Sequence, residues 1–350
     1  MAHSGNHGRF SRAVLSPMPS TRTAPGIRRP MSPGTAATPV GRFHSLLNRE
    51  NQPMDDASLI LMERIFQVVF PLLAIVTAGY VYARRVHTDM SVANRINMDV
   101  FTPALILSVM ADKSFDLALY QPLAIGAVCV VIGSGLLVAP LCRVIGIHPK
   151  TFLPPMMFNN SGNLGIPLTV LAFGEQALPA AVVLFLVENS LHFTLGMYML
   201  NPRIHPLSLL RIPMILAAIA GLVISSAGWV LPVFLKTFID MLGQIAIPLM
   251  LFSLGVRMLS IDLSNWRSGV IGAVLCPLSG VLMALAAQQV LQLDDTQFRY
   301  LMLFGALPPA LLNYLVAERY NQEPQQVASI VLLSNIASLI IIPLTLAFIL

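Results

Sequence analysis

Charged residues are scarce in this sequence. Only 11% of its 350 residues are Asp, Glu, Lys or Arg, and 56% are hydrophobic, whereas an ordinary soluble domain carries about 25% charged residues. So little charge cannot cover the surface of a soluble globular protein. The composition therefore predicts a membrane protein.

Cysteine is also scarce. The three cysteines, Cys129, Cys142 and Cys276, lie in apolar runs, so they cannot form a disulfide framework, and we expect buried small hydrophobic side chains. No Cys-x-x-Cys spacing indicates a metal site. No Gly-x-x-x-x-Gly-Lys-Ser/Thr loop is present, which argues against ATP as an energy source. We expect neither a metal nor a cofactor.

Positive charge is concentrated at the N-terminal end. Residues 1–53 hold seven arginines and one acidic residue, and residues 54–350 hold 14 Lys and Arg against 15 Asp and Glu. A nearly neutral body gives no support to nucleic-acid binding. The tail is rich in Pro, Ser and Thr without apolar periodicity, so we expect it to be disordered. It resembles a transit peptide; the alternative is that translation begins at Met54 or Met62.

The rest of the chain reads as transmembrane helices joined by short loops. A helix needs about 20 mostly apolar residues to cross about 30 Å of hydrocarbon. On this basis we expect an all-α membrane protein with about ten spans. The predicted spans are 59–83, 93–111, 118–142, 151–173, 177–200, 212–231, 234–258, 268–291, 298–317 and 326–349.

The distribution of Lys and Arg predicts the orientation. Loops that follow odd-numbered spans carry ten of these residues, whereas the opposite side carries four outside the tail. Because positive loops stay in the cytoplasm, both termini should be extracytoplasmic in a multi-pass protein of the cell membrane, which we take to be a bacterial inner membrane. An arginine-rich tail outside conflicts with the same rule and favours the later start.

The two halves of the body resemble each other. Residues 54–200 and 201–350 would each hold five spans, and an odd number makes a duplicated half inverted in the membrane. The segment FTPALILS, which begins at Phe101, resembles AIPLMLFS at an offset of 145. In the fourth and ninth spans Phe158 aligns with Phe304 at an offset of 146.

The fourth and ninth spans both contain helix-breaking residues. Gly162 and Pro167 interrupt one span, and Pro308 and Pro309 interrupt the other. Broken helices at matched positions of two halves indicate a transporter's binding site, and each second half-helix would direct a partly positive N-terminus toward the midplane. This predicts an anionic substrate. The alternative is a pair of kinked packing helices, since Gly and Pro are common in membrane spans.

At these residues the sequence resembles the auxin efflux carrier family, which includes plant auxin exporters and bacterial carboxylate permeases. The resemblance rests on four segments: NSGNLGIPL (160–168), LPPALLNYLVAERYN (307–321), ANRINMDVFTPALILS (93–108) and IPLMLFSLG (247–255). The resemblance covers roughly residues 60–350. It implies a ten-span fold of two inverted five-helix repeats, with crossed, broken fourth and ninth helices, and a secondary carrier of organic anions.

One departure bears on the substrate. Where the plant exporters have Asn-Pro-Asn at the start of the sixth span, this chain has Ile212-Pro213-Met214. A polar contact to the substrate is therefore missing, which speaks against auxin. The resemblance then implies a permease of the bacterial carboxylate type.

The candidate site residues come from both interrupted spans. We expect one side of the substrate site to be formed by Asn160, Ser161, Gly162 and Asn163, and the other side by Pro308, Pro309 and Asn313.

Glu188 and Asn335 are candidates for coupling transport to an ion. Glu188 lies near the middle of the fifth span, where insertion scales assign Asp, Lys or Arg a cost of about 2.5–3.5 kcal/mol, so an ionisable group there is a functional candidate. His192, four residues on, shares its face of the helix. The alternative is a purely structural hydrogen bond.

Together these features predict a proton- or sodium-coupled carrier of small mono- or dicarboxylates in the lipid bilayer. A homodimer is compatible with this interpretation. The rival from another class is an uncoupled anion channel. We do not expect an enzyme, because the spans contain no nucleophile and base pair and no set of metal ligands.

Overall fold

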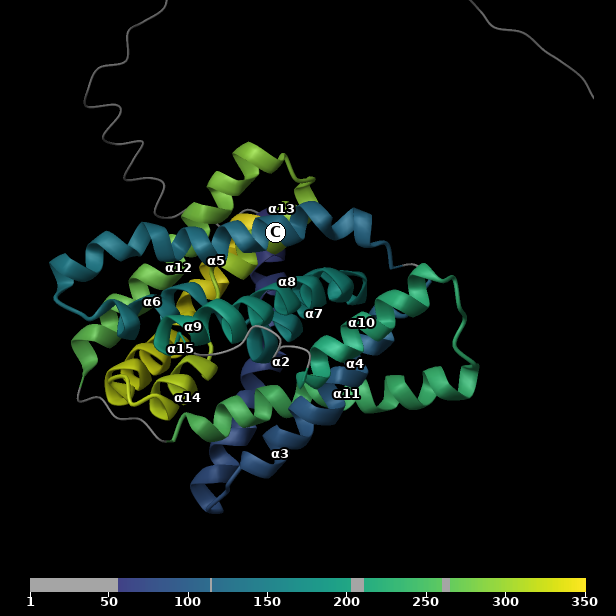
Figure 1. Cartoon of the computed structure of the whole chain (residues 1–350), viewed down its shortest axis with the longest axis horizontal. Coiled ribbons are helices and arrows are strands. Elements are labelled where there is room, and N and C mark those ends of the chain that lie inside the picture. Colours follow the sequence, from purple (N-terminus) through teal and green to yellow (C-terminus); the bar gives the residue numbers. More distant parts are fainter. Residues whose placement is uncertain (1–55, 114, 203–210, 260–264) are drawn as a thin grey trace, which may run out of the picture. The chain divides into compact units, whose positions relative to one another are not determined.

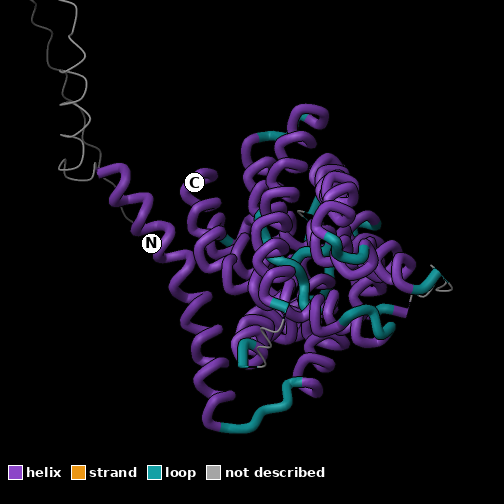
Figure 2. The backbone as a smooth tube through the Cα atoms, turned by 90° about the vertical axis from the view of Figure 1, so that its left-hand side faces the viewer, coloured by secondary structure: helices purple, strands orange, loops and turns teal. Residues whose placement is uncertain are grey.

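The computed structural model describes residues 56–113, 115–202, 211–259 and 265–350. Every regular element among these residues is a helix, so the predicted all-α class is confirmed (Figure 2). The predicted disordered tail, residues 1–53, lies outside the described residues.

Six helical stretches are long and apolar enough to cross a membrane. They are Leu59–Arg85, Leu117–Ile145, Glu175–Leu200, Val233–Arg257, Trp266–Leu291 and Pro324–Ile349. These stretches contain α2 (Asp56–Arg85), α5 (Leu117–Ile145), α8 (Leu178–Leu191), α9 (Met197–Leu200), α11 (Val233–Arg257), α12 (Trp266–Leu291) and α15 (Pro324–Ile349). The prediction of a multi-pass membrane protein is thus supported, and the other four predicted spans contain shorter helices.

The shorter elements lie at four predicted spans. They are α3 (Ser91–Ile96), the π-helix η2 (Asn97–Phe101), α4 (Thr102–Met110), α6 (Pro149–Met157), the π-helix η3 (Ser161–Gly165), α7 (Ile166–Phe173), α10 (Pro213–Ser226), α13 (Asp295–Gly305) and α14 (Leu312–Arg319). A short 3-10 helix, η4 (Glu175–Ala177), precedes α8, and a third π-helix, η5 (His192–Gly196), follows it. π-helical turns inside α-helices often mark functional sites.

Short polar residues set the ends of several helices. The Asp116 side chain accepts a hydrogen bond from the backbone nitrogen of Ala118 at the start of α5. Asp294 accepts from the backbone nitrogens of Thr296 and Gln297 at the start of α13. Each aspartate satisfies backbone N–H groups that the first helical turn leaves without a partner.

One group of helices consists of α2, α4, α10 and α11, and Figure 1 shows α4, α10 and α11 side by side. The helices α2 and α11 cross at two glycines. A Cβ atom at Gly255 would lie 1.9 Å from the Val76 carbonyl oxygen, and one at Gly79 would lie 2.1 Å from the Phe252 carbonyl oxygen. Only glycine allows this approach, as in many helix crossings in membranes.

A second group consists of α5, α6, α12, α13 and α15, with α8 packed against α5. Its apolar core includes the fully buried side chains of Leu123, Phe158, Leu301 and Leu346. On the outside of the described helices many large apolar side chains are exposed, as expected where lipid replaces water.

Candidate functional site

Helical structure stops at corresponding places in two elements of the second group. The first interruption separates the end of α6 at Met157 from the start of η3 at Ser161. The second separates the end of α13 at Gly305 from the start of α14 at Leu312. Phe158 is extended, with φ −105° and ψ 100°. The second interruption contains Pro308 and Pro309, as the sequence predicts. The first lies at residues 158–160, before the predicted breakers, because Gly162 lies within η3 and Pro167 is in the first turn of α7.

The two interruptions pair with each other as a short antiparallel bridge between Asn159 and Pro309. The backbone nitrogen of Asn160 donates to the Pro308 carbonyl at 2.7 Å, and that of Ala310 donates to the Phe158 carbonyl at 3.0 Å. The prolines have no N–H group to leave unpaired. Backbone that has left its helix is therefore satisfied by the other interruption rather than by water.

Two asparagine side chains brace this bridge. The amide nitrogen of Asn159 donates to the Phe304 carbonyl at 2.7 Å. The amide nitrogen of Asn313 donates to the carbonyl oxygens of Phe158, at 2.8 Å, and Ala310, at 2.9 Å. Both asparagines are buried, and these bonds supply the partners that buried carbonyls require.

Asn335 of α15 connects both interruptions. Its side-chain oxygen accepts from the amide of Asn160 at 3.2 Å. Its side-chain nitrogen donates to the carbonyls of Pro309, at 3.1 Å, and Val331, at 2.7 Å. The asparagines that the sequence places in separate spans thus meet at one point.

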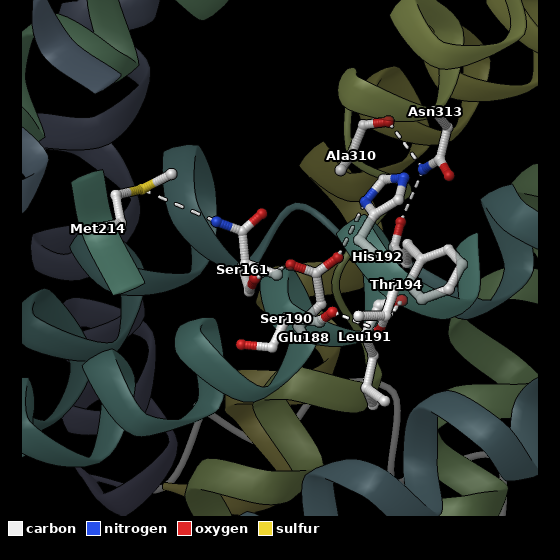
Figure 3. Close-up of polar contacts among 11 residues, drawn as sticks. Ser161, Glu188, Ser190, Leu191, His192, Thr194, Met214, Ala310 and Asn313 are labelled. Atoms are coloured by element: carbon white, nitrogen blue, oxygen red, sulfur yellow. Dashed lines mark hydrogen bonds and ion pairs between the residues drawn. The ribbon is translucent and has the colours of Figure 1, made fainter. Parts of the chain in front are cut away.

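Glu188 lies between Ser161, the first helical residue after the first interruption, and His192 (Figure 3). The Ser161 hydroxyl donates to its Oε2 at 2.9 Å, and its Oε1 lies 3.4 Å from Nδ1 of His192. The side chains of Glu188 and His192 are only 3% and 2% exposed. The His192 ring stacks on Phe158 with ring centroids 4.3 Å apart and planes within 10°. A buried carboxylate without such partners would carry a large desolvation cost.

A large cavity of about 810 Å³ ends at the same crossing. Asn160, Asn163 and Asn335 line it, together with residues from α2, α3, α11 and α14. Asn160 is 2% exposed, whereas His87 and Gln325, which also line the cavity, are exposed. The cavity therefore leads from an open mouth to buried asparagines.

The predicted site residues divide by their surroundings. Asn160, Asn163 and Asn335 line the cavity, whereas Ser161, Pro308, Pro309 and Asn313 do not. At Gly162 an added Cβ atom would lie 2.8 Å from the Phe185 ring, so this glycine allows close packing of η3 on α8. Sequence reasoning did not find Arg257 and Tyr314, which also line the cavity. The only signal for Arg257 was a cation at the end of an apolar run, which we interpreted as a marker of orientation.

Comparisons with known proteins indicate membrane transport. Residues 202–346 match a family model described as "Membrane transport protein". A protein of Rhizobium meliloti (strain 1021) named "Putative malonate transporter" is 25% identical over 302 residues, which cover 79% of this chain and 93% of that protein. A protein of Methanothermobacter thermautotrophicus named "Uncharacterized transporter" is 28% identical over 303 residues, which cover 79% of this chain and 96% of that protein.

The apolar helices and these matches together define a multi-pass membrane transport protein. Within that class, the match over residues 202–346 and the two relatives are consistent with the resemblance to the auxin efflux carrier family that the motifs predict.

Proposed function

We propose that this protein is a secondary active carrier of small carboxylates that works by alternating access at the crossing of the two interruptions. The observation that carries the proposal is the cavity that ends at Asn160, Asn163 and Asn335. Asparagine amides can donate to a carboxylate without the desolvation cost of a buried cation. The helical turns that begin at Ser161 and Leu312 add N–H groups and partial positive charge at the same place.

The crossing fits a pair of broken transmembrane helices. In this interpretation α6, η3 and α7 form the fourth span, and α13 and α14 form the ninth. Unpaired backbone is tolerated at membrane depth where it is buried in protein or lines a cavity, and both conditions are met by the bridge between Asn159 and Pro309 and by the cavity beside it. The bacterial relative named for malonate supports a carboxylate as the substrate.

Two matched contacts support the inverted repeat of residues 54–200 and 201–350. Ser108 of α4 donates to Asp240 of α11, and Ser253 of α11 donates to Asn94 of α3. The serines are 145 residues apart and their acceptors are 146 apart, which are the offsets of the sequence repeat. An inverted repeat would exchange these two contacts, so their matched spacing supports that arrangement.

The position of the cavity's mouth supports a conformation that is open to one side of the membrane. His87 follows the predicted first span, and Gln325, in the first turn of α15, follows the predicted ninth span. The charge distribution predicts that this side is cytoplasmic. A separate pocket of about 230 Å³, lined by Lys113 and Asp240, lies at the predicted outer side and contains none of the crossing residues. We interpret the conformation as inward-open.

The Glu188 and His192 pair is the proposed coupling element. Its carboxylate holds the hydroxyl of Ser161, the residue after Asn160, so a change in its protonation would act directly on the crossing. His192 is the titratable group in contact with Glu188 in the described part of the chain. His192 also lines a narrow void of about 10 Å³ with the exposed Lys150, about the space that one water needs. This arrangement favours a proton over sodium.

The test is carboxylate uptake into proteoliposomes that hold the purified protein. A panel of mono- and dicarboxylates is offered under a pH gradient, under a sodium gradient and under neither. We expect saturable uptake that concentrates the anion only under the pH gradient. Uptake without saturation or accumulation would identify a channel, accumulation under the sodium gradient alone would reassign the coupling ion, and no carboxylate flux would reject the proposal.

A paired variant separates binding from coupling. Glu188→Gln keeps the shape of the side chain and removes the group that takes up the proton. The variant should still bind and exchange carboxylates but lose accumulation under the pH gradient. Glu175→Gln, at an exposed carboxylate, serves as the control. A Glu188→Gln protein that still concentrates substrate under the pH gradient would give Glu188 a structural role only.

A further inference from the structure

The charged residues that line the large cavity differ in depth. His87, Asp89, Arg257 and Glu318 carry its ionisable groups in the described part of the chain, beside the phenol of Tyr314. His87, Asp89 and Glu318 are exposed, and Arg257 is partly buried at the C-terminal end of α11. Because charges in a partly desolvated position are screened less by water and salt, the charge of Arg257 should be screened less than those of the three exposed groups.

The two acidic groups at the mouth are engaged locally. Oδ1 of Asp89 accepts from the backbone nitrogen of Ser91 at 2.8 Å, and Oδ2 accepts from its hydroxyl at 2.7 Å. These hydrogen bonds, the backbone one foremost, lower the pKa of Asp89. Oε1 of Glu318 accepts from the Tyr314 hydroxyl at 2.8 Å. Both carboxylates are exposed and accept hydrogen bonds from local donors.

Packing fixes the end of α11 that carries Arg257. Gly255 contacts the backbone of α2 so closely that a Cβ atom there would lie 1.9 Å from the Val76 carbonyl oxygen. Ser253 donates to Asn94 at 2.6 Å, and Asn94 itself lines the cavity. The guanidinium is thus attached to a rigid helix end, where a cation is favoured by the helix dipole.

We propose that Arg257 is the specificity-determining residue that binds the second carboxylate of a dicarboxylate substrate, while the first carboxylate is bound by the asparagines at the crossing. This inference rests on the proposed transport of carboxylates. Arg257 and the three asparagines line one continuous cavity, which offers a cationic region and a neutral amide region. A guanidinium binds a carboxylate with two parallel hydrogen bonds, whereas a monocarboxylate held at the asparagines has no second group for it.

The test compares mono- and dicarboxylate binding to Arg257→Gln. Affinities are measured in detergent by displacement of radiolabelled malonate and of a radiolabelled monocarboxylate, with uptake into proteoliposomes as a second readout. Loss of hydrogen bonds to a charged group corresponds to a decrease of about 10- to 150-fold in affinity for dicarboxylates. Monocarboxylate affinity should stay within about twofold. Arg143→Gln, at an exposed arginine outside the cavity, should change neither affinity.

Arg257→Lys carries the test if Arg257→Gln does not fold. Lysine keeps the charge but loses the paired geometry, so dicarboxylate affinity should fall severalfold with monocarboxylate affinity unchanged. Equal losses for both substrate classes, no loss for either, or a wild-type protein that binds monocarboxylates alone would overturn the role of Arg257. A wild-type protein that moves no carboxylate would instead reject the proposed function.

Discussion

Replacing Asn160 by alanine should weaken substrate binding and leave the crossing intact. Its backbone nitrogen donates to the Pro308 carbonyl at 2.7 Å, and alanine keeps this bond. The substitution removes only the side-chain amide, which donates to Asn335 at 3.2 Å. Asn335 retains its own bonds to the carbonyls of Pro309 and Val331. The second asparagine should therefore stay oriented when the first is lost.

The Asn160→Ala substitution should have different effects on protein stability and on substrate affinity. The bond between the Asn160 and Asn335 side chains joins neutral groups, so its loss should cost about 0.5–1.5 kcal/mol of stability. A hydrogen bond from the same amide to a carboxylate substrate would contribute about 1.5–3 kcal/mol, which corresponds to about 10- to 150-fold in affinity. Substrate affinity should thus fall by more than stability does.

The assay is a double-mutant cycle of Asn160→Ala and Asn335→Ala. Thermal unfolding and the dissociation constant of a radiolabelled carboxylate are measured for each variant. The two sites should be non-additive in both quantities, because their side chains contact each other. Asn189→Ala is the matched control, since Asn189 is also a buried asparagine but contacts Met214 of α10 and does not line the cavity.

An Asn160→Ala protein with wild-type affinity and flux would remove the crossing from the account of substrate binding. Equal losses for Asn160→Ala and Asn189→Ala would show that the effect follows from general destabilisation of buried amides. Additive effects of Asn160→Ala and Asn335→Ala would contradict the contact between them.

Two further predictions concern packing and orientation. Gly255→Ala should destabilise the protein by about 1–3 kcal/mol in thermal unfolding, because its Cβ atom would meet the backbone of α2. Gly133→Ala is the control and should be tolerated, because its Cβ atom would meet only the flexible side chain of Met283. Equal stability of the two variants would refute the argument. In a cysteine-free background, a cysteine at Asp294 should react with an impermeant thiol reagent in intact cells and one at Gln325 should not, whereas the reverse pattern would invert the predicted orientation.

The membrane class and the interruptions could be predicted because both depend on local sequence. Length and hydropathy alone decide whether a helix can cross a bilayer. Pro308 and Pro309 lie where helical structure stops, and Gly162 lies two residues after the first interruption, within η3. The bridge between Asn159 and Pro309 joins residues 150 positions apart. Local sequence does not predict a contact between residues so far apart, so this contact could be expected only by assuming that the two halves pair.

The candidate site was predictable by residue type but not by role. Asn160 and Asn313 looked equivalent in the sequence, yet Asn160 lines the cavity while the amide of Asn313 donates to two backbone carbonyls. Substrate binding by Asn313 stays a prediction, and the observed bonds assign it a bracing contact. Arg257 was missed because an arginine at the end of an apolar helix is also what an ordinary cytoplasmic end contains.

The two halves of the proposed repeat differ in the residues that would couple transport to a proton and bind substrate. The contacts of Ser108 and Ser253 each join the two halves at matched positions, as a framework shared by both halves would predict. At the offset of 146 that aligns Asn189 with Asn335, Glu188 aligns with Ser334, so the carboxylate has no ionisable counterpart. One half would then couple transport through Glu188 and Ser161, while the other contributes Asn335 to the substrate site. Because Ser161 follows Asn160 directly, a proton taken up in the first half would alter the contact that joins the two.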